Sequence, residues 1–157
     1  MSRNDEFDND TNEALFSLNF TLPNKQKVSG NFYSDTTIDY EKLEQELVEA
    51  PSKFAFWSVL LAEQKYKVSV VEKQVTRRRA KVYETMKNND NGVKLTKYMM
   101  DELVAGDDEI LELEGRLILE RKIESKLWAA VEALKMKSEH LRSLAGFKKQ
   151  ELRDLSQ

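Results

Sequence analysis

An apolar stripe that repeats in steps of three and four residues is the strongest constraint on the fold of this chain. Its members are Phe54, Trp57, Leu61, Val68, Val71, Val75, Val82 and Met86. This spacing is typical of a helix that packs along a helix–helix seam, as in a coiled coil. We therefore expect a helix over 52–87, which is about 50 Å long at about 1.5 Å per residue.

A second stripe with the same spacing predicts a partner helix in the C-terminal third. Its apolar members are Ile110, Leu113, Leu117, Leu127, Val131, Leu134, Leu141 and Leu144. Asp107 and Asp108 supply the negative charge that is favoured in a first helical turn, and the helix is expected to reach about residue 155. A short helix over 95–105, closed by Gly106, separates the two long helices.

Polar residues interrupt both stripes. Gln64 and Arg78 interrupt the first, and Glu120 and Glu124 interrupt the second. In an antiparallel hairpin Arg78 and Glu120 would lie at a similar depth, so Arg78 is expected to pair with Glu120 or Glu124. Buried ionic layers of this kind more often fix the register of two helices than add stability.

The N-terminal third carries different patterns. Residues 1–13 are acidic and polar without periodicity, which predicts a disordered segment. Residues 14–34 alternate apolar and polar side chains on both sides of a turn at 23–26, which predicts a β-hairpin. A helix is expected over 38–50, where Pro51 ends it.

These patterns together predict a mainly α fold that oligomerises through its helices. Its helical domain would span 35–157 as a long antiparallel helical hairpin with short helices, and the N-terminal β-hairpin would be an appendage. Seams of this length exceed what one thin hairpin can bury, so further copies of the chain are expected to cover them. A lone β-hairpin is marginal in water, so it is expected to dock on the helices or on a neighbouring copy.

The composition argues against an enzyme. The chain of 157 residues has no cysteine, which excludes disulfides, a thiolate metal site and a cysteine nucleophile. His140 is its single histidine, so a site with several histidine ligands is excluded. It also lacks a glycine-rich phosphate loop and the common hydrolase and zinc-protease motifs. We expect no catalytic residues, no cofactor and no metal.

The apolar segments are too short for a membrane protein. None approaches the roughly 20 residues that a helix needs to span a bilayer. The acidic start has the wrong sign for a signal peptide. The expected location is the cytoplasm, or the host cytoplasm if the chain is encoded by a phage.

Charge is strongly segregated along the chain, although the formal net charge is only −3. Residues 1–50 carry 4 basic and 11 acidic side chains, and residues 51–100 carry 11 basic and 4 acidic ones. Segregation of this kind informs about binding partners rather than about the fold. The middle of the chain is therefore the candidate binding region.

Basic side chains of this middle region form the candidate nucleic-acid-binding site, which comprises Lys73, Arg77, Arg78, Arg79, Lys81, Lys87, Lys94 and Lys97. Lys73, Arg77 and Lys81 are spaced four residues apart and share one helical face. Such side chains neutralise phosphates, and nearby Tyr83 and Tyr98 could stack on unpaired bases. The alternative is a solvated helix face, and either tyrosine could instead belong to the core.

From residue 38 to about residue 152 the chain resembles the UvsY-like recombination mediators of T-even-type bacteriophages. The resemblance rests on Ile38-Asp39-x-x-Lys42-Leu43-x-x-Glu46, Trp57, Val71-Glu72-x-Gln74, Arg79-Ala80-Lys81 with Tyr83, Asp108-x-x-Ile110-Leu111, Trp128, and Ala133-Leu134-x-x-Lys137. It implies a ring of six or seven subunits that binds single-stranded DNA. The basic helix residues of the family map onto Arg79 and Lys81. The N-terminal β-hairpin is a departure from the family.

The resemblance also implies a function and partners. Mediators of this family help to load a RecA-like recombinase onto single-stranded DNA that is coated by a single-stranded-DNA-binding protein. The competing hypothesis is a helical structural or assembly protein, such as a phage scaffold or virion component, whose basic face binds an acidic protein. A DNA-binding regulator is disfavoured, because no short helix-turn-helix with a recognition helix is apparent.

Overall fold

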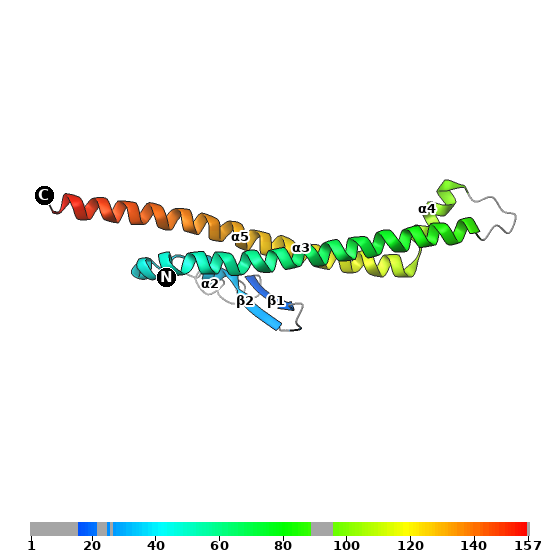
Figure 1. Ribbon diagram of the computed structural model, residues 1–157, viewed down its shortest axis with the longest axis horizontal. Helices are drawn as coiled ribbons and strands as arrows, with labels where there is room; N and C mark the ends of the chain where they lie inside the picture. Colours follow the sequence, from blue (N-terminus) through cyan, green and yellow to red (C-terminus); the bar gives the residue numbers. More distant parts are fainter. Residues whose placement is uncertain (1–15, 22–24, 26, 89–95, 157) are drawn as a thin grey trace, which may run out of the picture. The chain divides into compact units, whose positions relative to one another are not determined.

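The computed structural model describes residues 16–21, 25, 27–88 and 96–156. Its elements are β1 (Ser17–Thr21), β2 (Lys27–Asn31), α2 (Phe32–Thr36), η1 (Tyr40–Lys42), α3 (Leu43–Asn88), α4 (Lys97–Ala105) and α5 (Asp108–Asp154). Figure 1 labels the strands and the α-helices. The predicted mainly α fold with an N-terminal β-hairpin is confirmed. The expected disorder of residues 1–13 and the site residue Lys94 lie outside the described residues.

The chain divides into two compact units. The terminal unit combines residues 1–63 with 125–157, and the central unit comprises residues 64–124. The helices α3 and α5 contribute to both units. Within the central unit, residues 72 and 79 of α3 meet residues 121 and 114 of α5, respectively. Since the numbers rise on one helix as they fall on the other, the two helices are antiparallel, as predicted.

Pro51 lies inside α3 and does not end it, so the predicted break between two helices at this position is wrong. A proline inside a helix removes one backbone hydrogen bond and costs about 3 kcal/mol. Ala50 and Trp57 are buried on either side of it, and burial of apolar surface offsets this cost. The helix also starts later than expected, because η1 precedes it and Asp39 caps η1 by accepting from the backbone N–H of Glu41 at 3.0 Å.

The β-hairpin has the predicted antiparallel pairing, in which Leu18 faces Gly30 and Phe20 faces Val28. Its second strand ends earlier than residue 34. The side chain of Asn31 accepts a hydrogen bond from the backbone N–H of Tyr33 at 2.9 Å and starts the short helix α2. Asn31 is both the last residue of β2 and the N-cap of α2, so the chain changes from strand to helix at Phe32.

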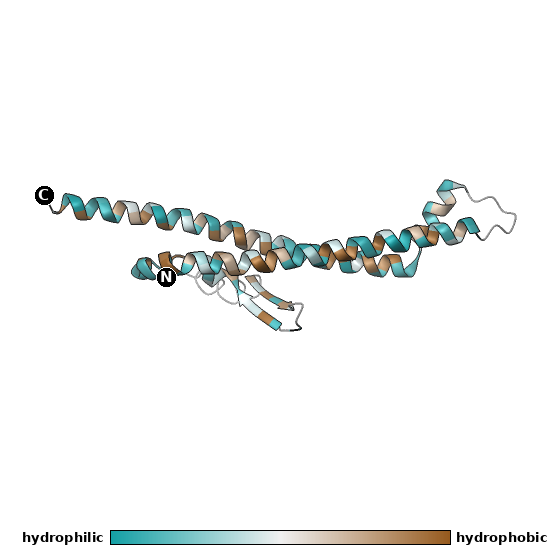
Figure 2. Cartoon of the chain, viewed as in Figure 1, coloured by the Kyte–Doolittle hydropathy of each residue, from teal (hydrophilic) through white to brown (hydrophobic). Residues whose placement is uncertain are grey.

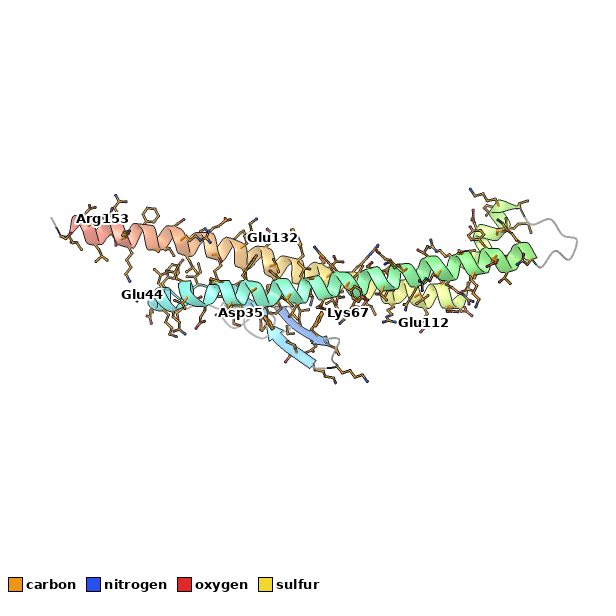
Figure 3. The ribbon with its side chains drawn as sticks, in the orientation of Figure 1. Asp35, Glu44, Lys67, Glu112, Glu132 and Arg153 are labelled. Atoms are coloured by element: carbon orange, nitrogen blue, oxygen red, sulfur yellow. The ribbon has the colours of Figure 1, made fainter. Side chains whose placement is uncertain are left out.

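The β-hairpin and α2 dock on the side chain of Trp57. Its ring lies edge-on to Phe32 at a centroid distance of 5.9 Å, and its Nε1–H donates to Asp35 at 2.9 Å. A Cβ atom at Gly30 would lie 3.1 Å from the Trp57 ring, so any larger residue would require the ring to move by a few tenths of an ångström. Figure 3 shows Asp35 on the hairpin side of α3. The docking of the hairpin on the helices, one of the two expected arrangements, is therefore confirmed.

Each unit has an apolar core built from the two predicted stripes. In the terminal unit Trp57, Leu127, Leu134 and Leu141 are almost fully buried, and in the central unit Val71 and Ile110 are. Polar residues alternate with apolar ones along both long helices (Figure 2). None of the helices among the described residues contains an apolar stretch that could span a bilayer.

Candidate nucleic-acid interface

Exposed basic side chains follow one stripe of α3 in the central unit. Lys73, Arg77 and Lys81 are spaced one helical turn apart, and all three are exposed. Within the residues that the structure describes, none of them forms an ion pair. Their positive charge therefore remains available to an anionic ligand.

Arg78 does not pair with Glu120 or Glu124, so that prediction is wrong. Its Nε and Nη2 donate to the two carboxylate oxygens of Asp107 at 3.1 and 2.7 Å, and its Nη1 lies 2.6 Å from Glu109. A two-pronged contact of this kind is the strongest geometry between an arginine and a carboxylate. Arg78 is thus a fixed part of the helix–helix contact.

The register explains the error about Arg78. Beyond residue 78, α3 contacts α4, where the hydroxyl of Tyr83 donates to Asp101. Residue 78 therefore meets the very start of α5. Glu120 instead meets Gln64, whose Nε2 donates to its carboxylate at 2.7 Å and to its backbone carbonyl at 2.8 Å.

The contact between Arg78 and Asp107 favours the charged form of both side chains. The hydrogen bond from Arg78 holds the pKa of Asp107 below its usual range, and a hydrogen bond from the backbone N–H of Ile110 acts in the same direction. The contact also raises the pKa of Arg78. Asp107 thereby has two roles, since it binds Arg78 and caps the start of α5.

Arg79 lies on the other side of the helix from Arg77 and Lys81. It forms an ion pair with Glu114 of α5. Residues two apart on a helix point in nearly opposite directions, since each residue turns by about 100°. The structure therefore does not bring Arg79 together with the stripe of free cations.

A shallow groove of about 410 Å³ runs along the seam between α3 and α5 on the side of Arg77. We call this side of the central unit the basic flank. It is lined by Gln74, Arg77, Arg78, Lys81, Glu109, Leu113 and Arg116. Four of these side chains are basic and one is acidic, and the acidic one is already bound to Arg78.

Arg116 is the member of this groove that sequence reasoning missed. It is exposed, it comes from α5, and it forms no ion pair among the described residues. The stripe on α3 could be recognised from spacing alone. Assigning Arg116 to the same groove requires knowledge of the register between α3 and α5. The prediction that Arg78 pairs with Glu120 or Glu124 gave an incorrect register.

The two tyrosines of the region are both engaged by acidic residues of α4. The hydrogen bond from Tyr83 to Asp101 raises the pKa of Tyr83, and one from Tyr98 to Glu102 at 2.5 Å raises that of Tyr98. The Tyr98 side chain is nevertheless 70% exposed, whereas that of Tyr83 is half-buried. Of these two tyrosines, Tyr98 is the one that presents an open aromatic face.

The remaining predicted cations lie at the far end of the unit. Lys87 is exposed in the last turn of α3, and Lys97 is exposed at the start of α4. Neither lines the groove of the basic flank. The described residues contain no cluster of three or more histidine, cysteine, aspartate or glutamate side chains that could hold a metal ion.

Comparison with solved structures identifies the fold. Three crystal structures of the bacteriophage T4 recombination mediator protein UvsY, in lattice types IV, I and II, superpose on the chain with TM-scores of 0.64, 0.61 and 0.61. Their sequence identities are 16%, 18% and 15%, and the matches cover 76%, 76% and 77% of this chain and 92%, 95% and 92% of theirs. No protein-family model and no curated protein matches the sequence. The chain therefore shares the fold of this mediator at low sequence identity.

Proposed function

We propose that this chain binds single-stranded DNA along its basic flank and acts as a recombination mediator. In this role it helps to load a RecA-like recombinase onto DNA that is coated by a single-stranded-DNA-binding protein. The observation that carries the proposal is the convergence on one groove of Arg77, Lys81 and Arg116, which come from two helices and have no ion-pair partner among the described residues. The fold shared with the T4 mediator supports the same conclusion.

The basic flank suits a polyanion because its charge is not neutralised internally. Arg78, Asp107 and Glu109 together carry a charge of −1, which the three positive charges of Arg77, Lys81 and Arg116 outweigh. Binding of phosphates to such side chains releases counterions, and this supplies affinity that does not depend on sequence. Lys73 extends the same stripe by one turn.

The exposed ring of Tyr98 favours an unpaired strand. Aromatic side chains stack on bases, and every base offers a face for such stacking once it is unpaired. The base faces of a duplex are covered by their neighbours. Single-stranded DNA is therefore the nucleic acid that we expect this unit to prefer.

Assembly into a ring of six or seven subunits would multiply a modest affinity per subunit. The terminal unit exposes large apolar side chains on both long helices, namely Val48, Phe56, Val59, Trp128, Met136, Phe147 and Leu152. Contacts between the subunits of a ring would remove these apolar side chains from water. Several basic flanks in one assembly raise the effective concentration of binding sites for one strand.

Mediation of this kind requires no covalent chemistry and no cofactor. The assembly would hold the strand by its phosphates, weaken the contacts of the competing single-stranded-DNA-binding protein, and present the strand to the recombinase. For a phage-encoded chain, this activity belongs in the host cytoplasm.

Binding of single-stranded and duplex DNA over a salt series tests the proposal. Three phosphate contacts per subunit predict a slope of about −2 in log affinity against log salt for a single strand. We expect a preference for the single strand and a loss of about twentyfold between roughly 50 and 200 mM salt for each subunit engaged. Absence of DNA binding at low salt would refute the proposal and would favour an assembly protein with an acidic partner.

A further inference from the structure

The side of the central unit opposite the basic flank carries four charged residues in two cross-helix ion pairs. Arg121 of α5 lies 2.7 Å from Glu72 of α3, and Arg79 of α3 pairs with Glu114 of α5. All four side chains remain 36–59% exposed. We call this side the alternating flank.

A groove with both polar and apolar lining separates the two ion pairs. It has a volume of about 570 Å³, and Val75, Leu117 and Ile118 contribute its apolar lining. Ile118 is 69% exposed, although it lies in the middle of this groove. Leu111 is seven residues away on the same face of α5 and is 52% exposed. The flank thus presents apolar surface that none of the described residues of the central unit covers.

The spacing along this flank is that of a second helix–helix seam. Residues 111, 114, 118 and 121 of α5 follow one another in steps of three and four, and so do residues 72, 76 and 79 of α3. Such spacing keeps side chains on one face of a helix that packs against another helix. The first seam joins α3 to α5, and this second one faces outward.

The four charges alternate in sign around the groove. Each helix carries one negative and one positive residue seven positions apart, and the helices are antiparallel with unlike charges paired across the seam. The four charges thus form the corners of a rectangle. Glu72 and Glu114 lie on one diagonal, and Arg79 and Arg121 lie on the other. A second copy can face this one across a twofold axis that lies in the plane of the contact, either along the helices or perpendicular to them. In both arrangements every charge meets one of opposite sign.

The two flanks differ in net charge. The four residues of the alternating flank sum to zero, whereas the basic flank keeps the charge of Arg77, Lys81 and Arg116. Two basic flanks would repel each other, while two alternating flanks would attract. Exposed ion pairs contribute little to the stability of a monomer, so folding alone gives no strong reason for this arrangement.

We propose that the alternating flank binds the alternating flank of a second copy of this chain in a twofold-symmetric contact. In such a contact the same patch is used on both subunits. This goes beyond the proposed ring, because a ring uses two different patches on each subunit. The twofold contact gives every subunit one additional partner and leaves both basic flanks open.

Two matched substitutions test the apolar part of the contact. Ile118→Glu places a charge in the groove, whereas Leu119→Glu changes the neighbouring, similarly exposed residue, which is about 100° further round the helix. We expect light scattering to show that Ile118→Glu halves the mass of the assembly and that Leu119→Glu leaves it unchanged. Circular dichroism reports whether helicity is retained. A wild-type mass for Ile118→Glu, or an equal loss for both variants, would overturn the proposal.

Inversion of all four charges tests the electrostatic part. The variant E72R/R79E/E114R/R121E keeps both ion pairs and the net charge, but it exchanges the signs around the groove. It should associate with itself as the wild type does, because its pattern is again self-complementary. It should not associate with wild-type chains through this flank, since like charges would then meet. Free mixing of labelled wild-type and inverted chains into one twofold pair would overturn the proposal.

Discussion

Replacement of Arg77, Lys81 and Arg116 together by glutamine is expected to reduce affinity for single-stranded DNA by on the order of a hundredfold at low salt. These three side chains carry the unbalanced charge of the basic flank and come from both α3 and α5. Each lost phosphate contact should also lower the salt slope by about 0.7, so the variant should retain little salt dependence. Fluorescence anisotropy with a labelled oligonucleotide over a salt series measures both quantities.

A matched variant distinguishes a site from a general effect of charge. Arg142, Lys149 and Arg153 are exposed on α5 in the terminal unit and have no ion-pair partner among the described residues. Their replacement by glutamine removes the same two arginines and one lysine from the formal charge. We expect this control to bind DNA like the wild type. Equal losses in the two triple variants would show that the basic flank is not the binding site.

Replacement of Lys137 by methionine is expected to lower the free energy of unfolding by about 3–5 kcal/mol. The ammonium group of Lys137 is buried, with its side chain only 1% exposed. It lies 2.5 Å from the carboxylate of Glu46 and donates to the backbone carbonyls of Asp35 and Thr37 at 2.9 and 2.6 Å. Its removal leaves a buried carboxylate and two carbonyls without their partner. Urea denaturation followed by circular dichroism measures the loss.

Two further variants control this prediction. Lys135→Met alters an exposed lysine two residues away and should change the stability by less than about 0.5 kcal/mol. In the double variant K137M/E46L no charge is left unpaired, so part of the loss should be recovered. If Lys137→Met and Lys135→Met unfold at the same urea concentration, Lys137 does not hold the N-terminal segment to the helices.

Periodicity predicted the architecture because the core follows directly from it. Trp57, Val71, Leu134 and Leu141 belong to the two predicted stripes and are almost fully buried. The prediction that Pro51 ends a helix followed the general rule that proline disrupts helices. This rule does not take into account that burial of residues on both sides of Pro51 stabilises α3. Lys137 gave no signal as a buried residue, since an isolated lysine in a charged helix is usually solvated.

The candidate site was predictable only where it depends on one helix. The spacing of Lys73, Arg77 and Lys81 places them on one stripe whatever they face. The place of Arg79 on the opposite side of α3 also follows from the helical period, but the position of Arg116 depends on how α3 and α5 are aligned. A local sequence pattern does not carry this information. Contacts between distant residues decide which cations share a groove.

Crosslinking from two neighbouring positions tests most directly whether the basic flank holds the strand. Gln74 lines the groove of the basic flank, and Thr76 lines the groove on the alternating flank. Both are exposed on α3, and they lie two residues apart. With a photoreactive amino acid at either position, we expect single-stranded DNA to crosslink at 74 and not at 76. Crosslinking at 76 alone, or with equal yield at both positions, would contradict the assignment of the basic flank as the DNA-binding surface.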